Sequence, residues 1–117
     1  LTSKKMQNHA QQAIEFRNCM TQPLGNVTQK TLSLQTRLIA EETEELMEAT
    51  RLMAFNMSNV QIRADCLKEL ADVTYVCYQL AAAIGWDLDT ALDRVHASNM
   101  SKLENGKPVK DKQGKIQ

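Results

Sequence analysis

The chain has 117 residues, 43% of them hydrophobic and 24% charged, and its 14 basic and 14 acidic residues give a formal net charge of zero. This length predicts one domain with a modest core, and the charge balance excludes a general attraction to nucleic acid or to an acidic membrane surface. No apolar run approaches the ~20 residues of a membrane span. The odd set of Cys19, Cys66 and Cys77 contains no C-x-x-C pair, so we expect free thiols in a reducing, cytoplasmic setting.

Helical periodicity dominates the sequence and predicts an all-α fold of four helices with no strand. The first predicted helix spans residues 4–19 and has only a weak apolar face. The stretch 21–31 contains Pro23 and Gly25, which are typical of a loop, so we expect a loop or lid there. A long second helix follows over residues 32–53.

The third helix is predicted over residues 62–84, with Ser58 or Asn59 as its N-cap and Gly85 just after its last turn. Its second half, residues 73–84, is apolar or aromatic on nearly every side. A helix of this kind is buried on every side. In so short a chain the extra apolar face is expected to pack against a copy of itself, in a dimer or dimer of dimers.

Asp87 or Asp89 can cap the fourth helix, which runs to about Met100. The sequence then changes character. Residues 1–103 are expected to form the folded domain, and residues 104–117 a flexible basic tail. The lysines of this C-terminal region are Lys102, Lys107, Lys110, Lys112 and Lys115.

Two acidic pairs lie where the helical pattern predicts apolar faces. In projection, Glu42 is central in the apolar stripe of the second helix, and Glu45 borders that stripe. The same projection of the third helix gathers apolar residues around Glu69, with Asp72 to one side. An isolated Glu-x-x-Glu motif usually lies on a solvated helix face, but two acidic pairs on two apolar faces favour a common site.

Four converging carboxylates in apolar surroundings require a positive partner, because burial and mutual repulsion would otherwise protonate them. Arg37, Arg51, Arg63 and Lys68 lie on the same helices, but their projected positions fall well away from the acidic stripe. Oxygen ligands without Cys or His at matching spacing favour Mg²⁺ or Mn²⁺. A di-iron site is disfavoured because the Glu-x-x-His motif is missing. The sequence therefore predicts a magnesium site.

Three features carry a resemblance to a known family. They are the runs Glu41-Glu42-Thr43-Glu44-Glu45-Leu46 and Glu69-Leu70-Ala71-Asp72-Val73, and the pair Asn99 and Lys102. Together they resemble the MazG-like nucleoside triphosphate pyrophosphohydrolases, an all-α superfamily recognised by Glu-x-x-Glu followed on the next helix by Glu-x-x-Asp. The resemblance covers residues 30–103 and implies a four-helix MazG-like bundle. The C-terminal tail is similar to that of small stand-alone members.

The resemblance implies a hydrolase that cleaves a nucleoside triphosphate between its α and β phosphates, giving monophosphate and pyrophosphate. Mg²⁺ would neutralise phosphate charge and lower the pKa of the attacking water. Glu41 is either the general base or a solvated residue, while Asn99, Lys102 and, more weakly, Lys115 would contact phosphate oxygens. The implied metal ligands are Glu42, Glu45, Glu69 and Asp72.

Deoxynucleoside triphosphates are the expected substrates, in a role of cleaning the nucleotide pool. Phosphoribosyl-ATP and dUTP are alternative substrates on the same scaffold, and a non-catalytic, carboxylate-rich helical assembly is an alternative of another class. Nucleic-acid binding has only the basic tail in its favour. Trp86 stands where relatives carry an aliphatic side chain, so we expect it to pack in the core. Base recognition is expected to use the first helix, the loop over 21–31 and a partner chain.

Overall fold

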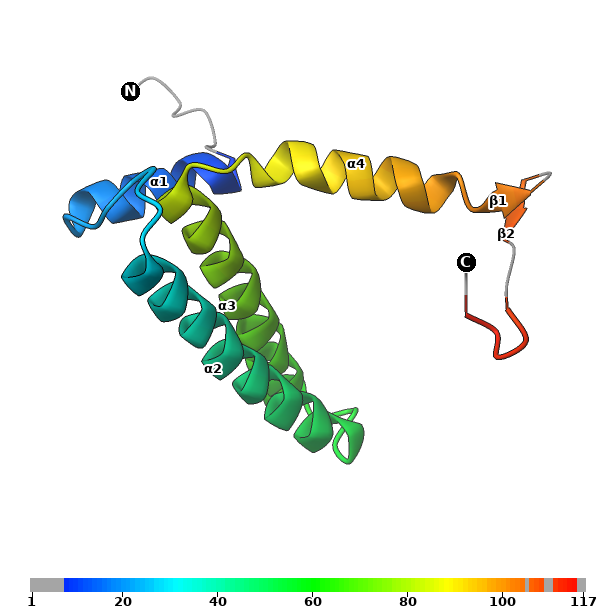
Figure 1. The fold of residues 1–117 in the computed structure, drawn as a ribbon. Helices are drawn as coiled ribbons and strands as arrows, with labels where there is room; N and C mark the ends of the chain where they lie inside the picture. Colours follow the sequence, from blue (N-terminus) through cyan, green and yellow to red (C-terminus); the bar gives the residue numbers. More distant parts are fainter. Residues whose placement is uncertain (1–7, 105, 109–110, 116–117) are drawn as a thin grey trace, which may run out of the picture. The chain divides into compact units, whose positions relative to one another are not determined.

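The computed structural model describes residues 8–104, 106–108 and 111–115 of the chain. Two compact units make up the chain, Leu1–Trp86 and Asp87–Gln117. The predicted all-α architecture with four helices is confirmed (Figure 1). The first unit contains helices α1 (His9–Cys19), α2 (Gln29–Ala54) and α3 (Val60–Ile84). The second contains helix α4 (Leu88–Met100) and strands β1 (Leu103–Glu104) and β2 (Lys107–Pro108).

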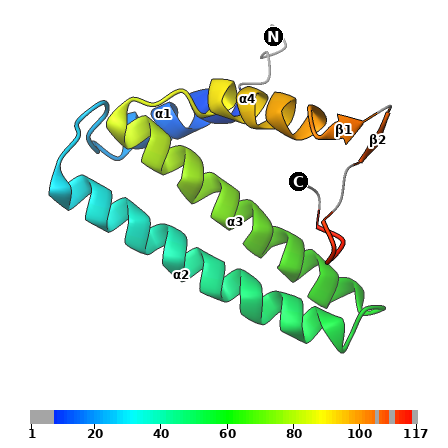
Figure 2. The same ribbon diagram turned by 45° about the vertical axis from the view of Figure 1, so that its right-hand side comes forward.

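Helices α2 and α3 form a long antiparallel hairpin, and both ribbon views show them side by side (Figure 2). The remaining helix of this unit, α1, packs against α3. The prediction for the first helix began at residue 4, but residues 4–7 lie outside the described part of the chain. The antiparallel hairpin matters for the site, because it sets the acidic face of α2 opposite that of α3.

Helix α3 begins and ends at the capping residues that the sequence predicts. The Asn59 side chain accepts a hydrogen bond from the Ile62 backbone N–H at 3.0 Å and so caps α3. Gly85 closes the same helix with a φ of 79°, a conformation that glycine adopts without strain. A Cβ at this position would come within 3.3 Å of the Gly25 Cα atom. Thr28 caps α2, so the predicted loop over 21–31 ends earlier than expected.

The cap of α4 is Asp87, and its pKa is held below the usual aspartate value. The cause is hydrogen bonding, because Thr90 Oγ1 (2.7 Å) and the Thr90 backbone N–H (3.1 Å) both donate to the carboxylate. A lowered pKa in the folded state means that capping is fully present above the ordinary aspartate pKa and is lost as the pH falls through the folded value.

We therefore expect the α4 helix to fray on acidification, and Asp87→Asn to remove this pH dependence because Asn is also a good N-cap. An NMR titration of the Asp87 carboxyl carbon measures the pKa, and α4 amide shifts report the helix. A titration midpoint at or above that of an ordinary aspartate would contradict the prediction.

Strands β1 and β2 depart from the expectation of no strand. They pair antiparallel, with Leu103 opposite Pro108 and Glu104 opposite Lys107. Gly106, with a φ of 75°, lies in the turn between them. Local pairing of two residues per strand leaves no periodicity in the sequence for a prediction to detect.

The second apolar face of α3 is partly covered by α1 rather than left for a copy of the chain. Tyr78 is buried, with its ring centroid 5.9 Å from that of His9. Tyr75 lies edge-on to Phe16, with ring centroids 5.8 Å apart. The helix α1 therefore takes up apolar surface for which the sequence suggested an oligomer contact.

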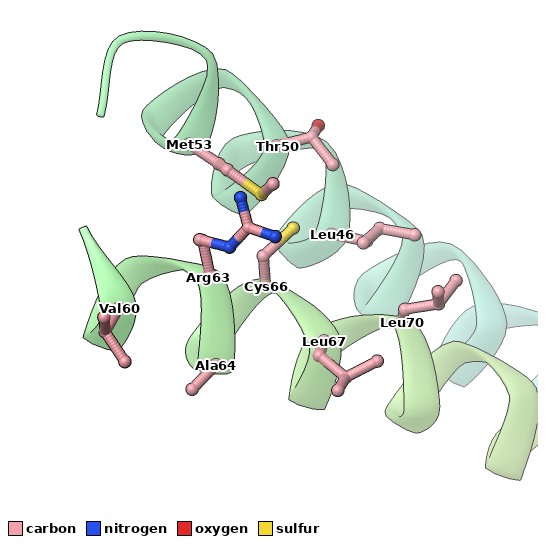
Figure 3. Close-up of a pocket in the computed structure, with 9 residues that line it drawn as sticks. All are labelled: Leu46, Thr50, Met53, Val60, Arg63, Ala64, Cys66, Leu67 and Leu70. Atoms are coloured by element: carbon pink, nitrogen blue, oxygen red, sulfur yellow. The ribbon is translucent and has the colours of Figure 1, made fainter. Parts of the chain in front are cut away.

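Apolar surface remains open at the far end of the hairpin. A cavity of about 590 Å³ lies between the second half of α2 and the first half of α3, and Leu46, Met53 and Leu70 are among the residues that line it (Figure 3). Leu67, on its rim, is 66% exposed. Trp86 is also exposed, so the prediction that it packs in the core was wrong.

None of the helices in the described part of the chain is both long and apolar enough to cross a membrane.

The three cysteines are free, as the sequence predicts. Cys66 is buried, and burial raises the pKa of the Cys77 thiol. A thiol with a raised pKa holds little thiolate at neutral pH and is a weak nucleophile.

Candidate metal and phosphate site

Three of the four predicted acidic ligands lie together on the α2–α3 hairpin. One carboxylate oxygen from each of Glu42, Glu69 and Asp72 lies within 4.8 Å of the other two. Glu69 and Asp72 are one turn apart on α3, so their side chains share a face of that helix. Glu42 joins them from α2, because the two helices run side by side. Three such groups at this spacing can bind one cation.

The carboxylates of this cluster are partly buried, and two of their oxygens are unpaired within the described part of the chain. Each of the three residues is half-buried. Oε2 of Glu42 and Oε2 of Glu69 are buried and have no hydrogen-bond partner among the described residues. An unpaired, buried carboxylate oxygen costs free energy. A divalent ion that prefers oxygen ligands would satisfy both atoms, so the residues present fit such a metal.

Lys68 occupies an unexpected position beside the cluster. Its Nζ atom lies 2.9 Å from Asp72 Oδ2 and 3.8 Å from Glu69 Oε1. The Asp72 hydrogen bond, then the charges of Asp72, Glu69 and Glu42, raise the pKa of Lys68. The prediction that Lys68 lies well away from the acidic stripe was therefore wrong. Lys68 lies four residues before Asp72, so the two side chains share a face of α3, about 40° apart in a helical projection.

Because the Lys68 ammonium group neutralises the same carboxylates as a metal would, the two compete. We expect Lys68→Gln to raise the affinity for Mg²⁺ or Mn²⁺ by about two- to fivefold, the small effect typical of an exposed ion pair. Isothermal titration calorimetry at fixed ionic strength measures the change, and Lys30→Gln, at an exposed position near the start of α2, is the matched control. A lower metal affinity in Lys68→Gln would show that Lys68 supports the bound ion instead.

Glu45 and Glu41 lie outside this cluster. Glu45 is one turn after Glu42 on α2 and is exposed, and its oxygens do not belong to the group of three. Glu41 is exposed as well. Their expected roles, as the fourth metal ligand and the general base, therefore stay predictions.

The predicted phosphate contacts all belong to the second unit. Asn99 is exposed in the last turn of α4, and Lys102 follows one turn later. Lys115 lies in a tight turn, where Asp111 Oδ1 accepts a hydrogen bond from its backbone N–H at 2.8 Å. The spacing of Asn99 and Lys102 puts both near the C-terminal end of α4, and their contact with phosphate stays a prediction.

Sequence analysis missed a second group of buried polar side chains on the first unit. Arg17, Gln35 and Gln79 are each at most 5% exposed. The sequence spacing could have pointed to the two glutamines. Gln35 lies seven residues before Glu42, and Gln79 lies seven residues after Asp72. Seven residues are about two helical turns, so each glutamine shares a helix face with an acidic residue.

Together these features define an all-α protein with an acidic site on two antiparallel helices that fits a divalent cation. Residues 11–99 match the model of the phosphoribosyl-ATP pyrophosphohydrolase family, and the chain belongs to that family. The family is part of the MazG-like superfamily of all-α pyrophosphohydrolases, so the resemblance seen in the sequence is confirmed. The chain is thus a nucleotide pyrophosphohydrolase, a hydrolase that acts on phosphorus anhydrides. No curated protein sequence matches it significantly.

Proposed function

We propose that the chain is a Mg²⁺-dependent enzyme that hydrolyses a nucleoside or deoxynucleoside triphosphate between its α and β phosphates. One water molecule is consumed, and the products are the monophosphate and pyrophosphate. The observation that carries this proposal is the cluster of Glu42, Glu69 and Asp72, with its two unpaired buried oxygens, in a chain of a pyrophosphohydrolase family.

In this proposal Glu42, Glu69 and Asp72 hold Mg²⁺, and Glu45 joins them from the next turn of α2. Mn²⁺ can substitute, since both ions prefer oxygen ligands. Bound metal supplies charge neutralisation at the phosphates and a more acidic water at neutral pH. Lys68 adds a positive charge beside Asp72, which favours the approach of an anionic substrate.

The chain's own residues divide the remaining tasks. Glu41 accepts a proton from the attacking water as the general base. Asn99, Lys102 and Lys115 donate hydrogen bonds to phosphate oxygens, which are strong acceptors. The family match ends at residue 99, so of these three only Asn99 lies within it. Lys102 and Lys115 are supported by charge alone.

We also propose that the chain forms a homo-oligomer, either a dimer or a tetramer. Its support is the open apolar surface at the end of the α2–α3 hairpin, where Val60 is 81% exposed and Leu67 is 66% exposed (Figure 3). Contiguous exposed apolar surface of this kind marks interaction sites in soluble proteins. A symmetric contact between copies buries it most simply.

Phosphoribosyl-ATP is the second candidate substrate, because the matching family carries that name. It contains the same triphosphate chain as ATP, so the same carboxylates serve both substrates. House-cleaning of the nucleotide pool with a preference for deoxynucleotides is our expectation for the first candidate. A substrate panel separates the two.

The test is to incubate the purified chain with Mg²⁺ and each of the common ribo- and deoxynucleoside triphosphates, dUTP and phosphoribosyl-ATP. Products are identified by chromatography. Monophosphate with pyrophosphate from deoxynucleoside triphosphates supports the first candidate, and turnover of phosphoribosyl-ATP alone replaces it with the second. Equal rates on ribose and deoxyribose forms would remove the deoxynucleotide preference. If no member of the panel is hydrolysed in the presence of Mg²⁺, the catalytic proposal is overturned in favour of a carboxylate-rich assembly module.

A further inference from the structure

The buried polar group of Arg17, Gln35 and Gln79 lies on the same unit as the acidic cluster, where α1 meets the hairpin. Arg17 Nε donates a hydrogen bond to the Pro23 carbonyl oxygen at 2.8 Å, and Arg17 Nη1 donates to Gln79 Oε1 at 3.3 Å. Gln79 Nε2 in turn donates to the Ala13 carbonyl oxygen at 3.4 Å. These contacts fix the positions of Arg17 and Gln79.

Gln35 is different from its two neighbours. It is 4% exposed, and its Oε1 atom is buried with no hydrogen-bond partner among the described residues. Folded proteins pair nearly all buried amide oxygens, because leaving one unpaired is costly. A ligand that brings an N–H or O–H donor would satisfy this acceptor.

A cavity of about 290 Å³ adjoins Gln35. Gln35, Arg17 and Gln79 line it together with two aromatic side chains, Phe16 and Tyr75. Both rings are partly exposed, so their surfaces are accessible to a ligand. A planar heterocycle can stack on aromatic surface while polar groups read its edge. The cavity therefore suits one nucleobase.

Its place along the hairpin agrees with this ligand. Gln35 precedes Glu42 by seven residues on α2, and Gln79 follows Asp72 by seven residues on α3. Seven residues of helix are about 10 Å long and return to the same face. In every nucleotide the ribose separates the base from the α-phosphate. A nucleotide with its phosphates at the acidic cluster can therefore reach Gln35 with its base.

We propose that this cavity binds the nucleobase of the substrate, and that Gln35 Oε1 accepts a hydrogen bond from the exocyclic amino group of adenine or cytosine. The inference rests on the proposed function and adds the substrate class to it. A carbonyl oxygen in place of the amino group, as in hypoxanthine or uracil, would face Gln35 Oε1 with a second acceptor. The enzyme thus selects bases that carry an amino group at this edge.

The test compares substrates that differ in that amino group alone. For the parent, kcat/KM is measured on dATP and on the deoxynucleoside triphosphate of unsubstituted purine, and on dCTP and its analogue without the 4-amino group. The expected preference for the amino-bearing member is about tenfold or more. Gln35→Met, which keeps side-chain length but accepts no hydrogen bond, is expected to abolish it. Gln29→Met, at an exposed position on the same helix, is expected to retain it.

Thermal unfolding of both variants shows whether the fold is kept. A parent that turns over both members of each pair equally, or a Gln35→Met variant that keeps the preference, would overturn the inference and leave the pyrophosphohydrolase proposal standing. If no triphosphate is hydrolysed, the proposed function fails, and calorimetric binding of dAMP against purine deoxynucleoside monophosphate decides the inference. Equal affinities there would overturn it as well.

Discussion

Glu42→Gln and Asp72→Asn are each expected to lower Mg²⁺-dependent turnover by about 100-fold or more, because each removes one anionic ligand from the acidic cluster. The amide replacements keep the volume of the side chain. Each replacement takes away a negative charge that holds the cation. Asp72→Asn also removes the charge that pairs with the Lys68 ammonium group. Both variants should therefore lose metal binding while they keep the hairpin.

Thermal unfolding with and without metal separates these two effects. Bound ligand raises the midpoint of the parent by an amount that grows with metal concentration, since the ion binds only the folded state. The variants should unfold near the parent's metal-free midpoint and show little further rise on adding Mg²⁺ or Mn²⁺. Replacing one carboxylate also lowers the electrostatic repulsion among the remaining acidic side chains, so the replacement itself should not unfold the hairpin.

Glu44→Gln and Asp65→Asn are the matched controls, since both acidic residues are exposed and lie on the same two helices. Each is expected to keep the parent's turnover and metal-induced rise in midpoint. Full activity in Glu42→Gln or Asp72→Asn would contradict the assignment of these residues to the metal site. An equal loss in the control variants would show a general effect of helix charge.

Local signals were sufficient to predict most of the fold. Asn59 and Asp87 cap the start of their helices by hydrogen bonds to residues three positions later. Gly85 ends α3 with a positive φ. The position of Glu42 on an apolar stripe followed from the helical period alone. Trp86 was misjudged because its exposure depends on what packs beside the end of α3, which local sequence does not encode.

The site was harder to predict, because it depends on which helices meet. The ion pair of Lys68 with Asp72 is an exception, because it follows from a spacing of four residues on one helix and was available from the sequence. The meeting of Arg17 with Gln79 joins residues 62 positions apart in the sequence. Glutamine is also more common on protein surfaces than inside, so composition gave no reason to place Gln35 in a cavity.

Arg17→Met is expected to lower the free energy of unfolding by about 2–4 kcal/mol, the largest stability effect that we predict, because it leaves one buried and one part-buried acceptor without their donors. Arg17 is 2% exposed, and burial lowers the pKa of its guanidinium group. The substitution would remove the donors to the Pro23 carbonyl oxygen and to Gln79 Oε1. These two bonds connect α1, the loop after it and α3, so their loss loosens the contact between elements.

The variant Arg17→Lys should fall between Arg17→Met and the parent. Lysine keeps a positive charge, but its single ammonium group lacks the planar fork that allows Arg17 to donate to two acceptors at once. Arg37→Met, at an exposed position on α2, is the control and is expected to change the free energy by no more than about 0.5 kcal/mol. Urea unfolding at a fixed protein concentration measures all three variants, because oligomerisation would make the midpoint concentration-dependent. If Arg17→Met unfolds at the same urea concentration as Arg37→Met, the hydrogen bonds of Arg17 do not stabilise the fold.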